Sequence, residues 1–147
     1  MNYWIFKCNP DLYNLDARLR DQNPEITWLV TRYINDIRPG DVAFLWQTGE
    51  ERGIRAVMKI ETLPQAMPEL PSEQSYWATP ETQVRCRVRG KLSHKGFALS
   101  ADQLKALPTL ADLSVFHGFQ QATNFPVSSE EGAALMAIIG GHIGFVA

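Results

Sequence analysis

The stretch PGDVAFLWQTGEERGIRAVMKIE, residues 39–61, decides the fold because it contains two strands joined by a polar loop. Its first residues, Pro39-Gly40-Asp41, are typical of a turn. Residues 42–47 form a continuous apolar run that predicts a buried strand, and residues 48–53 predict a hairpin loop. Residues 54–61 alternate, which predicts a second, half-buried strand. We expect Ile54, Ala56, Met58 and Ile60 to face inward and Arg55, Val57, Lys59 and Glu61 to face outward.

The residues before this hairpin predict one further strand and short helices. Residues 2–8 (NYWIFKC) are aromatic and β-prone, and they predict a buried first strand. Asn9-Pro10-Asp11 supplies a turn, after which Asp11 is placed to cap a short helix that runs to about Arg20. In residues 27–37 the apolar side chains have neither the spacing of a clean strand nor that of a long helix. We therefore expect one or two short helical turns there.

The residues after the hairpin predict a long loop, a strand and two helices. Residues 63–80 contain four prolines and predict a loop, whereas residues 82–92 alternate and predict a strand. Ser100–Gln103 and Ser128–Glu131 have the form of capping boxes, so each should begin a helix. The second helix should end at Gly140-Gly141 and offer to the core Leu135, Met136, Ile138 and Ile139.

Length and composition fit a single α+β domain over residues 1–147 with a curled, mostly antiparallel sheet. No run of about 18 apolar residues occurs, so neither a membrane span nor a membrane partner is expected. Polar residues inside the opening MNYWIFKCNP exclude a secretory signal. Cys8 and Cys86 lie far apart without CxxC spacing, as small buried side chains do in a reducing compartment. We therefore expect a cytoplasmic protein.

The sequence contains no recognisable catalytic or metal-binding motif. It has no GxSxG, P-loop, GxGxxG or HExxH pattern, and its three histidines are scattered. The acidic pair Glu50-Glu51 fits a solvated loop tip, and Glu130-Glu131 fits a helix cap. We therefore expect a binding module that is not an enzyme and that uses no cofactor or metal.

Charge is distributed unevenly along the chain. The net charge of −2 argues against a general nucleic-acid binder, but residues 81–95 carry five cations against one acidic residue. Spaced two apart, Arg85, Arg87, Arg89 and Lys91 should project from one strand face as a ridge about 20 Å long. Two interpretations stand: a solvated face whose cations pair with acids elsewhere, or a ridge that follows the phosphates of a nucleic acid.

Four tryptophans come from four separate segments. Trp4 lies within a strand and is expected in the core. Trp46 ends an apolar strand where polar residues begin, so it is expected to border a pocket as its floor. Trp28 and Trp77 adjoin polar or proline-rich segments, where large aromatic side chains serve as stacking surfaces or as anchors. The sequence thus favours an aromatic binding pocket.

Four motifs in register resemble the EVE domain family of the PUA-like superfamily. They are residues 3–10 (YWIFKCNP), residues 28–33 (WLVTRY), residues 39–46 (PGDVAFLW) with Gly53-Ile54, and residues 123–127 (TNFPV) with Glu130-Glu131. The resemblance runs from about residue 2 to residue 139. It implies a curled, barrel-like sheet of five or six strands with surrounding helices.

The superfamily includes YTH domains, which hold a methylated adenine in an aromatic cage, and related readers of modified cytosine. By this resemblance, Trp28 matches the first cage tryptophan, and Trp77 lies in the loop that supplies the second wall. Asn9-Pro10 replaces the serine-containing first turn of YTH domains, so adenine specificity is not implied. The predicted base-binding set is Asn9, Trp28, Thr31, Arg32, Trp46, Gln47, Trp77, Asn124 and Phe125, with Arg85, Arg87, Arg89 and Lys91 for the backbone.

The function favoured by these observations is a non-catalytic reader of a modified base in DNA or RNA. A reader must take the base out of its stack, and aromatic stacking then contributes about 1–3 kcal/mol. The alternative is a small-molecule sensor or a protein-interaction module that uses the same pocket. A third hypothesis, an RNA-processing hydrolase of the superfamily, has no evident Lys/Glu constellation. The sequence leaves open the nucleic acid and the modification.

Overall fold

The computed structural model describes residues 1–117 and 121–143 of the chain. These residues form strands, α-helices and two short 3₁₀ helices, η1 and η2. In chain order they are β1 (Tyr3–Cys8), α1 (Leu15–Arg20), β2 (Glu25–Leu29), β3 (Val42–Gln47), β4 (Gly53–Ile60), β5 (Gln65–Met67), η1 (Pro71–Tyr76), β6 (Arg85–His94), β7 (Leu99–Ser100), α2 (Ala101–Lys105), η2 (Ser114–Phe116), β8 (Asn124–Val127) and α3 (Ser129–Ile143).

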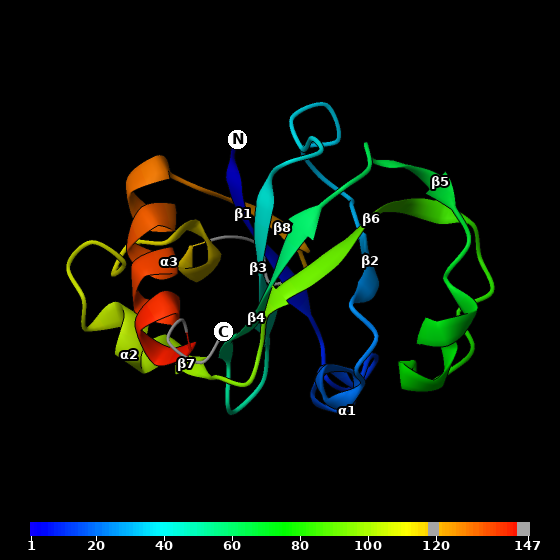
Figure 1. The fold of residues 1–147 in the computed structure, drawn as a ribbon, viewed down its shortest axis with the longest axis horizontal. Helices are drawn as coiled ribbons and strands as arrows, with labels where there is room; N and C mark the ends of the chain where they lie inside the picture. The colour runs from blue at the N-terminus through cyan, green and yellow to red at the C-terminus, as the bar shows by residue number, and fades with distance from the viewer. Residues whose placement is uncertain (118–120, 144–147) are drawn as a thin grey trace.

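The sheet is mixed, curled and open (Figure 1). Its main path runs β2-β6-β4-β3-β1-β8, while β5 pairs with β6 and β7 pairs with β4. Only the β1–β3 pairing is parallel among the described strands; the others are antiparallel. The predicted α+β class with a curled, mostly antiparallel sheet is therefore confirmed. Five or six strands were expected; the main path has six, and β5 and β7 bring the described sheet to eight.

Both faces of the central strands are buried, which corrects the expected pattern of β4. One core lies between the sheet and α2, η2 and α3, while the other lies on the side of α1 and η1 (Figure 1). In β1, Ile5 enters the first core, and its neighbours Trp4 and Phe6 enter the second. Arg55 and Val57, predicted to face outward, are 8% and 1% exposed. The alternating pattern predicted exposure wrongly for these two residues, because the face of β4 opposite Ile54 is covered by a second layer of the fold.

Residues 25–29 are a strand, so the prediction of helical turns at the start of residues 27–37 was wrong. Trp28 pairs with Val88, and Leu29 pairs with Arg87 of β6. The chain turns after β2, and Tyr33 adopts a positive φ of 60°. The apolar residues beyond Val30 therefore belong to a turn. Because residues 27–37 were treated as one segment, these turn residues hid the two-residue periodicity of the strand.

The helix ends follow the predicted chemistry at two places and depart from it at two. Both capping boxes form, with Ser100 and Ser128 accepting from the backbone N–H groups of Gln103 and Glu131. Helix α1 is capped by Asn14 rather than by Asp11, because the helix begins three residues later than predicted. Helix α3 continues through Gly140-Gly141 to Ile143. It does not end there because neither glycine adopts the positive φ of a helix C-cap.

The proline-rich residues 63–80 are not a plain loop, because they include β5 and η1. Strand β5 pairs with β6, and η1 packs near α1.

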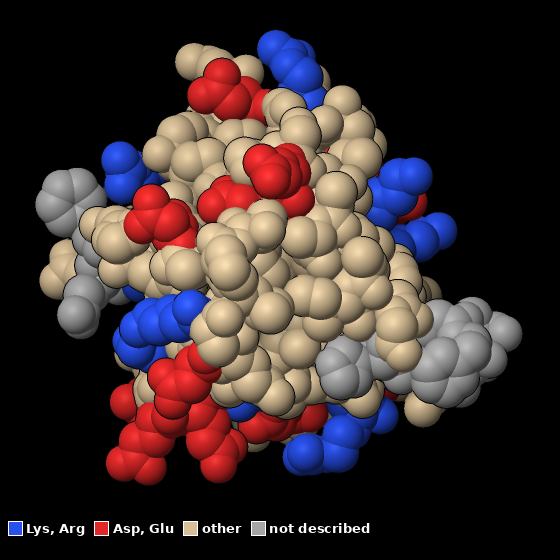
Figure 2. All heavy atoms as spheres, turned by 90° about the vertical axis from the view of Figure 1, so that its left-hand side faces the viewer, with Lys and Arg blue, Asp and Glu red and all other residues tan. Residues whose placement is uncertain are grey.

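On the opposite side of the molecule, the face over α2 and α3 is uncharged at its centre, with charged side chains around it (Figure 2). No helix within residues 1–117 and 121–143 is long and apolar enough to span a membrane.

Candidate functional site

A cavity of about 740 Å³ opens where β1, β2 and β3 end. Because β1 and β3 are parallel neighbours, their last residues reach the same edge of the sheet. The cavity lies across both cores: Trp28 belongs to the second and Trp46 to the first. It therefore has two ends with different walls, and its volume lies within the range of about 300–1,000 Å³ typical of ligand sites.

The first end of the cavity is aromatic. Trp28 and Trp77 both line it, and the Tyr13 ring makes edge contacts with each of them. The ring centroid of Tyr13 lies 6.0 Å from that of Trp28 and 5.1 Å from that of Trp77. A backbone bridge between Tyr13 and Trp77 joins the turn before α1 to the end of η1. Aromatic walls from three separate segments thus meet at this end.

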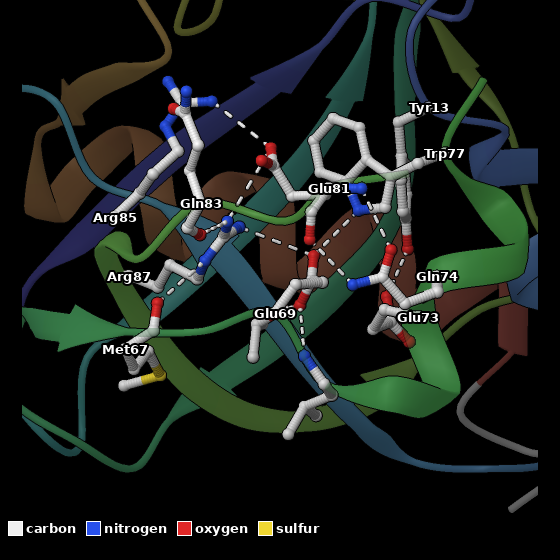
Figure 3. Close-up of polar contacts among 12 residues, drawn as sticks. Tyr13, Met67, Glu69, Glu73, Gln74, Trp77, Glu81, Gln83, Arg85 and Arg87 are labelled. Carbon is white, nitrogen blue, oxygen red and sulfur yellow. Dashed lines mark hydrogen bonds and ion pairs between the residues drawn. The ribbon is translucent and has the colours of Figure 1, made fainter. Parts of the chain in front are cut away.

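Glu69 fixes the aromatic end from beneath (Figure 3). Its Oε2 accepts from Trp77 Nε1 at 2.8 Å and from Arg87 Nη1 at 3.5 Å. Its Oε1 accepts from the Thr27 hydroxyl and from the Leu70 backbone N–H. With two partners on each oxygen, this buried carboxylate is saturated and serves to orient the Trp77 indole.

A second buried carboxylate, Glu73, holds Tyr13. Glu73 accepts from the Tyr13 hydroxyl and from Arg18 Nε, both at 2.5 Å. Burial raises the pKa of Glu73, although both hydrogen bonds and the Arg18 charge oppose the shift. Burial, followed by the charge of Glu73, also raises the pKa of Tyr13. The Tyr13 hydroxyl therefore stays protonated and acts as a donor, which holds its ring in edge contact with both tryptophans.

The second end of the cavity is walled by Trp46 and Phe116, whose ring centroids are 5.8 Å apart. Lys105 Nζ lies 4.9 Å from the Phe116 ring centroid. Arg52, in the loop between β3 and β4, also lines this cavity. Trp46 is buried in the first core and thus occupies the pocket border that its strand-end position predicted.

Cations dominate the charged lining. One carboxylate, Glu69, is found among the described lining residues, together with five cationic side chains: Lys7, Arg52, Arg85, Arg87 and Lys105. Burial lowers the pKa of Lys7. This excess of positive charge suits an anionic ligand, despite the overall net charge of −2.

The predicted ridge on β6 is wrong in its geometry, because Arg87 is fully buried. The face of Arg87 is covered by the segment that carries Glu69 and by Glu81, which lies 3.7 Å from Arg87 Nη2. The exposed members are each paired: Arg85 with Glu81, Arg89 with Glu25 and Lys91 with Glu61. Arg89 and Lys91 also lie outside the described lining of the cavity.

The structure brings Asn9, Trp28, Trp46 and Trp77 of the predicted base-binding set to one cavity. The remaining members are not among its described lining residues: Thr31, Arg32, Gln47, Asn124 and Phe125. Asn124 is fully buried, where its side chain accepts from the Thr31 N–H at 2.9 Å and donates to the Leu29 carbonyl at 3.1 Å. It therefore joins β8 to the end of β2, and Phe125 packs into the first core.

Sequence reasoning missed Tyr13, Glu69 and the cations Arg52 and Lys105. Glu69 lies between Pro68 and Pro71, so its surroundings indicated only a loop. Glu69 lies in the link between β5 and η1, whereas Tyr13, Arg52 and Lys105 adjoin turns. The approach of these residues to one another depends on how distant segments fold together. A buried partner for Arg87 could have been sought among the acids of residues 63–80, but no pattern singles out Glu69.

The two cysteines of the described chain lack the lowered pKa of a reactive thiol. Burial, with a smaller effect from Asp16, raises the pKa of the Cys8 thiol to about 12. Cys8 and Cys86 are free thiols. Within residues 1–117 and 121–143, no cluster of three or more His, Cys, Asp or Glu side chains could hold a metal ion.

The fold and the cavity together give an α+β protein with a curled sheet and an aromatic, cation-lined pocket. The model of the EVE domain family matches residues 2–138, and the chain belongs to this family. The family expected from the four sequence motifs is thereby confirmed. A comparison with curated proteins gives no match.

Solved structures share the fold at low sequence identity. Rpa0253 from Rhodopseudomonas palustris is 22% identical, with a TM-score of 0.65 over 95% of this chain and 94% of its own. A hypothetical protein from Leishmania major is 20% identical, with a TM-score of 0.67 over 97% and 96%. Human THYN1, solved in complex with 5-methylcytosine-containing DNA, is 16% identical, with a TM-score of 0.65 over 94% and 97%.

Proposed function

We propose that this protein is a non-catalytic reader of a modified base in nucleic acid, with DNA as the favoured partner. The observation that carries the proposal is the cavity in which Trp28, Tyr13 and Trp77 meet and five cations line the wall. Membership of the EVE family supports it, as does the shared fold of human THYN1 in its complex with 5-methylcytosine-containing DNA.

The aromatic end has the features that a base-sized ligand requires. A flipped base loses its stacking neighbours, and the faces of Trp28 and Trp77 replace them at about 1–3 kcal/mol per stacked base. The Glu69 and Glu73 contacts hold these walls in place before the ligand arrives, so little ordering entropy is lost on binding. Asn9 lies at the rim and is exposed, where its amide can reach the edge of the base.

The direct test is a fluorescence titration of Trp28→Ala and Trp77→Ala with oligonucleotides that carry 5-methylcytosine, with unmodified oligonucleotides as reference. Each variant should lose about 5- to 150-fold in affinity for the modified oligonucleotide, as a stacking energy of about 1–3 kcal/mol implies. Trp4→Phe is the matched control, because Trp4 is a core tryptophan that lies outside the described lining. Equal binding of modified and unmodified strands by the unsubstituted protein would contradict base reading.

A small organic ligand is the second candidate, favoured by the cavity volume of about 740 Å³. The two candidates differ in their response to salt. Nucleic-acid affinity falls linearly with the logarithm of salt concentration, because phosphate binding releases counterions, whereas the affinity of a neutral small molecule does not.

A further inference from the structure

The cavity is longer than its aromatic end, and its two ends differ in how their cations are paired. At the Trp28–Trp77 end, Arg87 and Arg85 already have carboxylate partners, Glu69 and Glu81. At the Trp46–Phe116 end, Arg52 and Lys105 are both exposed. Within the described residues, no carboxylate oxygen lies within 4.0 Å of either side-chain cation. These two charges are therefore available to an anionic ligand.

Arg52 and Lys105 belong to one rigid part of the fold. The Arg52 carbonyl accepts from the Ala101 N–H at 3.0 Å, at the start of the helix that Lys105 ends. Pairing of Gly53 with Ser100 fixes the same junction, where the Leu99 carbonyl approaches so closely that a Cβ on Gly53 would lie 2.1 Å from it. The loop between β3 and β4 and helix α2 thus present both cations from a single, closely packed support.

A base that enters the aromatic end brings its backbone with it. The sugar and its phosphates stay attached outside the slot, so they must lie along the remainder of the cavity or at its mouth. Acids next to the two cations in sequence, Glu50, Glu51 and Asp102, do not line the cavity in the described part of the chain. The face presented to the backbone is therefore positive.

We propose that Arg52 and Lys105 form a phosphate-binding subsite that holds the nucleic-acid backbone next to the base bound between Trp28 and Trp77. This inference rests on the proposed function. It places the backbone contacts on the β3–β4 loop and α2 rather than on the exposed face of β6. There, Arg89 and Lys91 already pair with Glu25 and Glu61.

The test compares Arg52→Ala/Lys105→Ala with the matched control Arg89→Ala/Lys91→Ala, which removes the same charge from β6. Affinity for a fluorescein-labelled oligonucleotide is measured over a series of NaCl concentrations. In the first variant the slope of log K against log salt should fall by about 2, with similar losses for modified and unmodified strands. The control should keep the slope of the unsubstituted protein. An unchanged slope in the first variant, or an equal fall in the control, overturns the subsite.

A second measurement separates the subsite from base reading itself. 5-Methyldeoxycytidine and its 5′-monophosphate share the base and differ in the phosphate. The unsubstituted protein should bind the monophosphate more tightly, and Arg52→Ala/Lys105→Ala should bind the two equally. If the monophosphate advantage survives in the variant, the subsite is wrong. If modified and unmodified bases bind equally while the salt slope still falls, the proposed base reading fails and the phosphate subsite stands.

Discussion

Replacing Glu69 by glutamine should destabilise the protein far more than the same change at a surface ion pair. Glu69 is 6% exposed and accepts four hydrogen bonds, from Thr27, Leu70, Trp77 and Arg87. The glutamine amide keeps one acceptor oxygen, but an NH₂ group replaces the other oxygen. That NH₂ group then faces N–H or O–H donors that had bonded to the carboxylate. It also leaves the buried Arg87 cation with only Glu81, 3.7 Å from Nη2, as a carboxylate partner among the described residues.

The expected loss follows from these contacts. A hydrogen bond to a charged group contributes about 1.5–3 kcal/mol, and breaking a buried ion pair costs about 3–5 kcal/mol. Because Glu81 still compensates Arg87 in part, we expect the free energy of unfolding to fall by about 3 kcal/mol. Glu61→Gln is the matched control: its partner Lys91 lies 3.9 Å away, both side chains are about half exposed, and the loss should be below about 1 kcal/mol.

Urea denaturation followed by far-UV circular dichroism measures both losses, provided that the m-value stays unchanged. The Glu69→Gln/Arg87→Met double variant should lose less than the sum of its single variants, because the two side chains interact. A Glu69→Gln loss no larger than that of Glu61→Gln would refute the conclusion that this carboxylate fixes the aromatic end.

Three further predictions test the packing and burial of individual residues. Gly132→Ala should destabilise the protein in thermal melts despite the higher helix propensity of alanine, because the new Cβ would lie 2.1 Å from the Tyr3 ring. Gly140→Ala, with nothing within 4 Å, should instead be neutral or stabilising by up to about 1 kcal/mol, and the reverse order would contradict the packing of α3 on β1. Asn124→Ala should lower the free energy of unfolding by about 2–3 kcal/mol, because it leaves buried backbone groups unpaired, and a loss below about 0.5 kcal/mol in urea would exclude its role as a link between strands. Cys8 should react slowly with iodoacetamide up to about pH 9, because the pKa of its thiol is raised from an ordinary 9.0 to about 12. Folding stability should therefore decline as pH rises through that interval, and rapid alkylation of the folded protein at pH 8 would contradict the raised pKa.

The strands of residues 39–61 and both capping boxes were predictable because their signals are local. A continuous apolar run between turn residues has few alternatives to a strand, and Ser128 with Glu131 satisfies a helix end without help from the rest of the chain. The ends of α3 and α1 were less predictable. Gly140 is compatible with a helix and with its end, and only the backbone angles decide between them.

The candidate site was predictable in its tryptophans and not in its polar contacts. Large aromatic side chains at segment ends are visible in the sequence, and Trp28, Trp46 and Trp77 do line one cavity. Alternation on β6 identified cations on one face, but it could not reveal that residues 63–80 fold over Arg87 and supply Glu69. The same limit applies to Asn124, whose position in a motif suggested a ligand contact and whose buried amide instead joins two strands.

Base reading by this protein is tested by the difference in affinity between a 5-methylcytosine oligonucleotide and its unmodified counterpart, measured by tryptophan fluorescence for the unsubstituted protein and for Trp77→Ala. A base-reading pocket should give a preference for the modified strand that is lost when the Trp77 wall is removed, while the salt-dependent binding to both strands persists. Equal affinity for the two strands in the unsubstituted protein, or a preference that survives in Trp77→Ala, would contradict a base-reading pocket between Trp28 and Trp77.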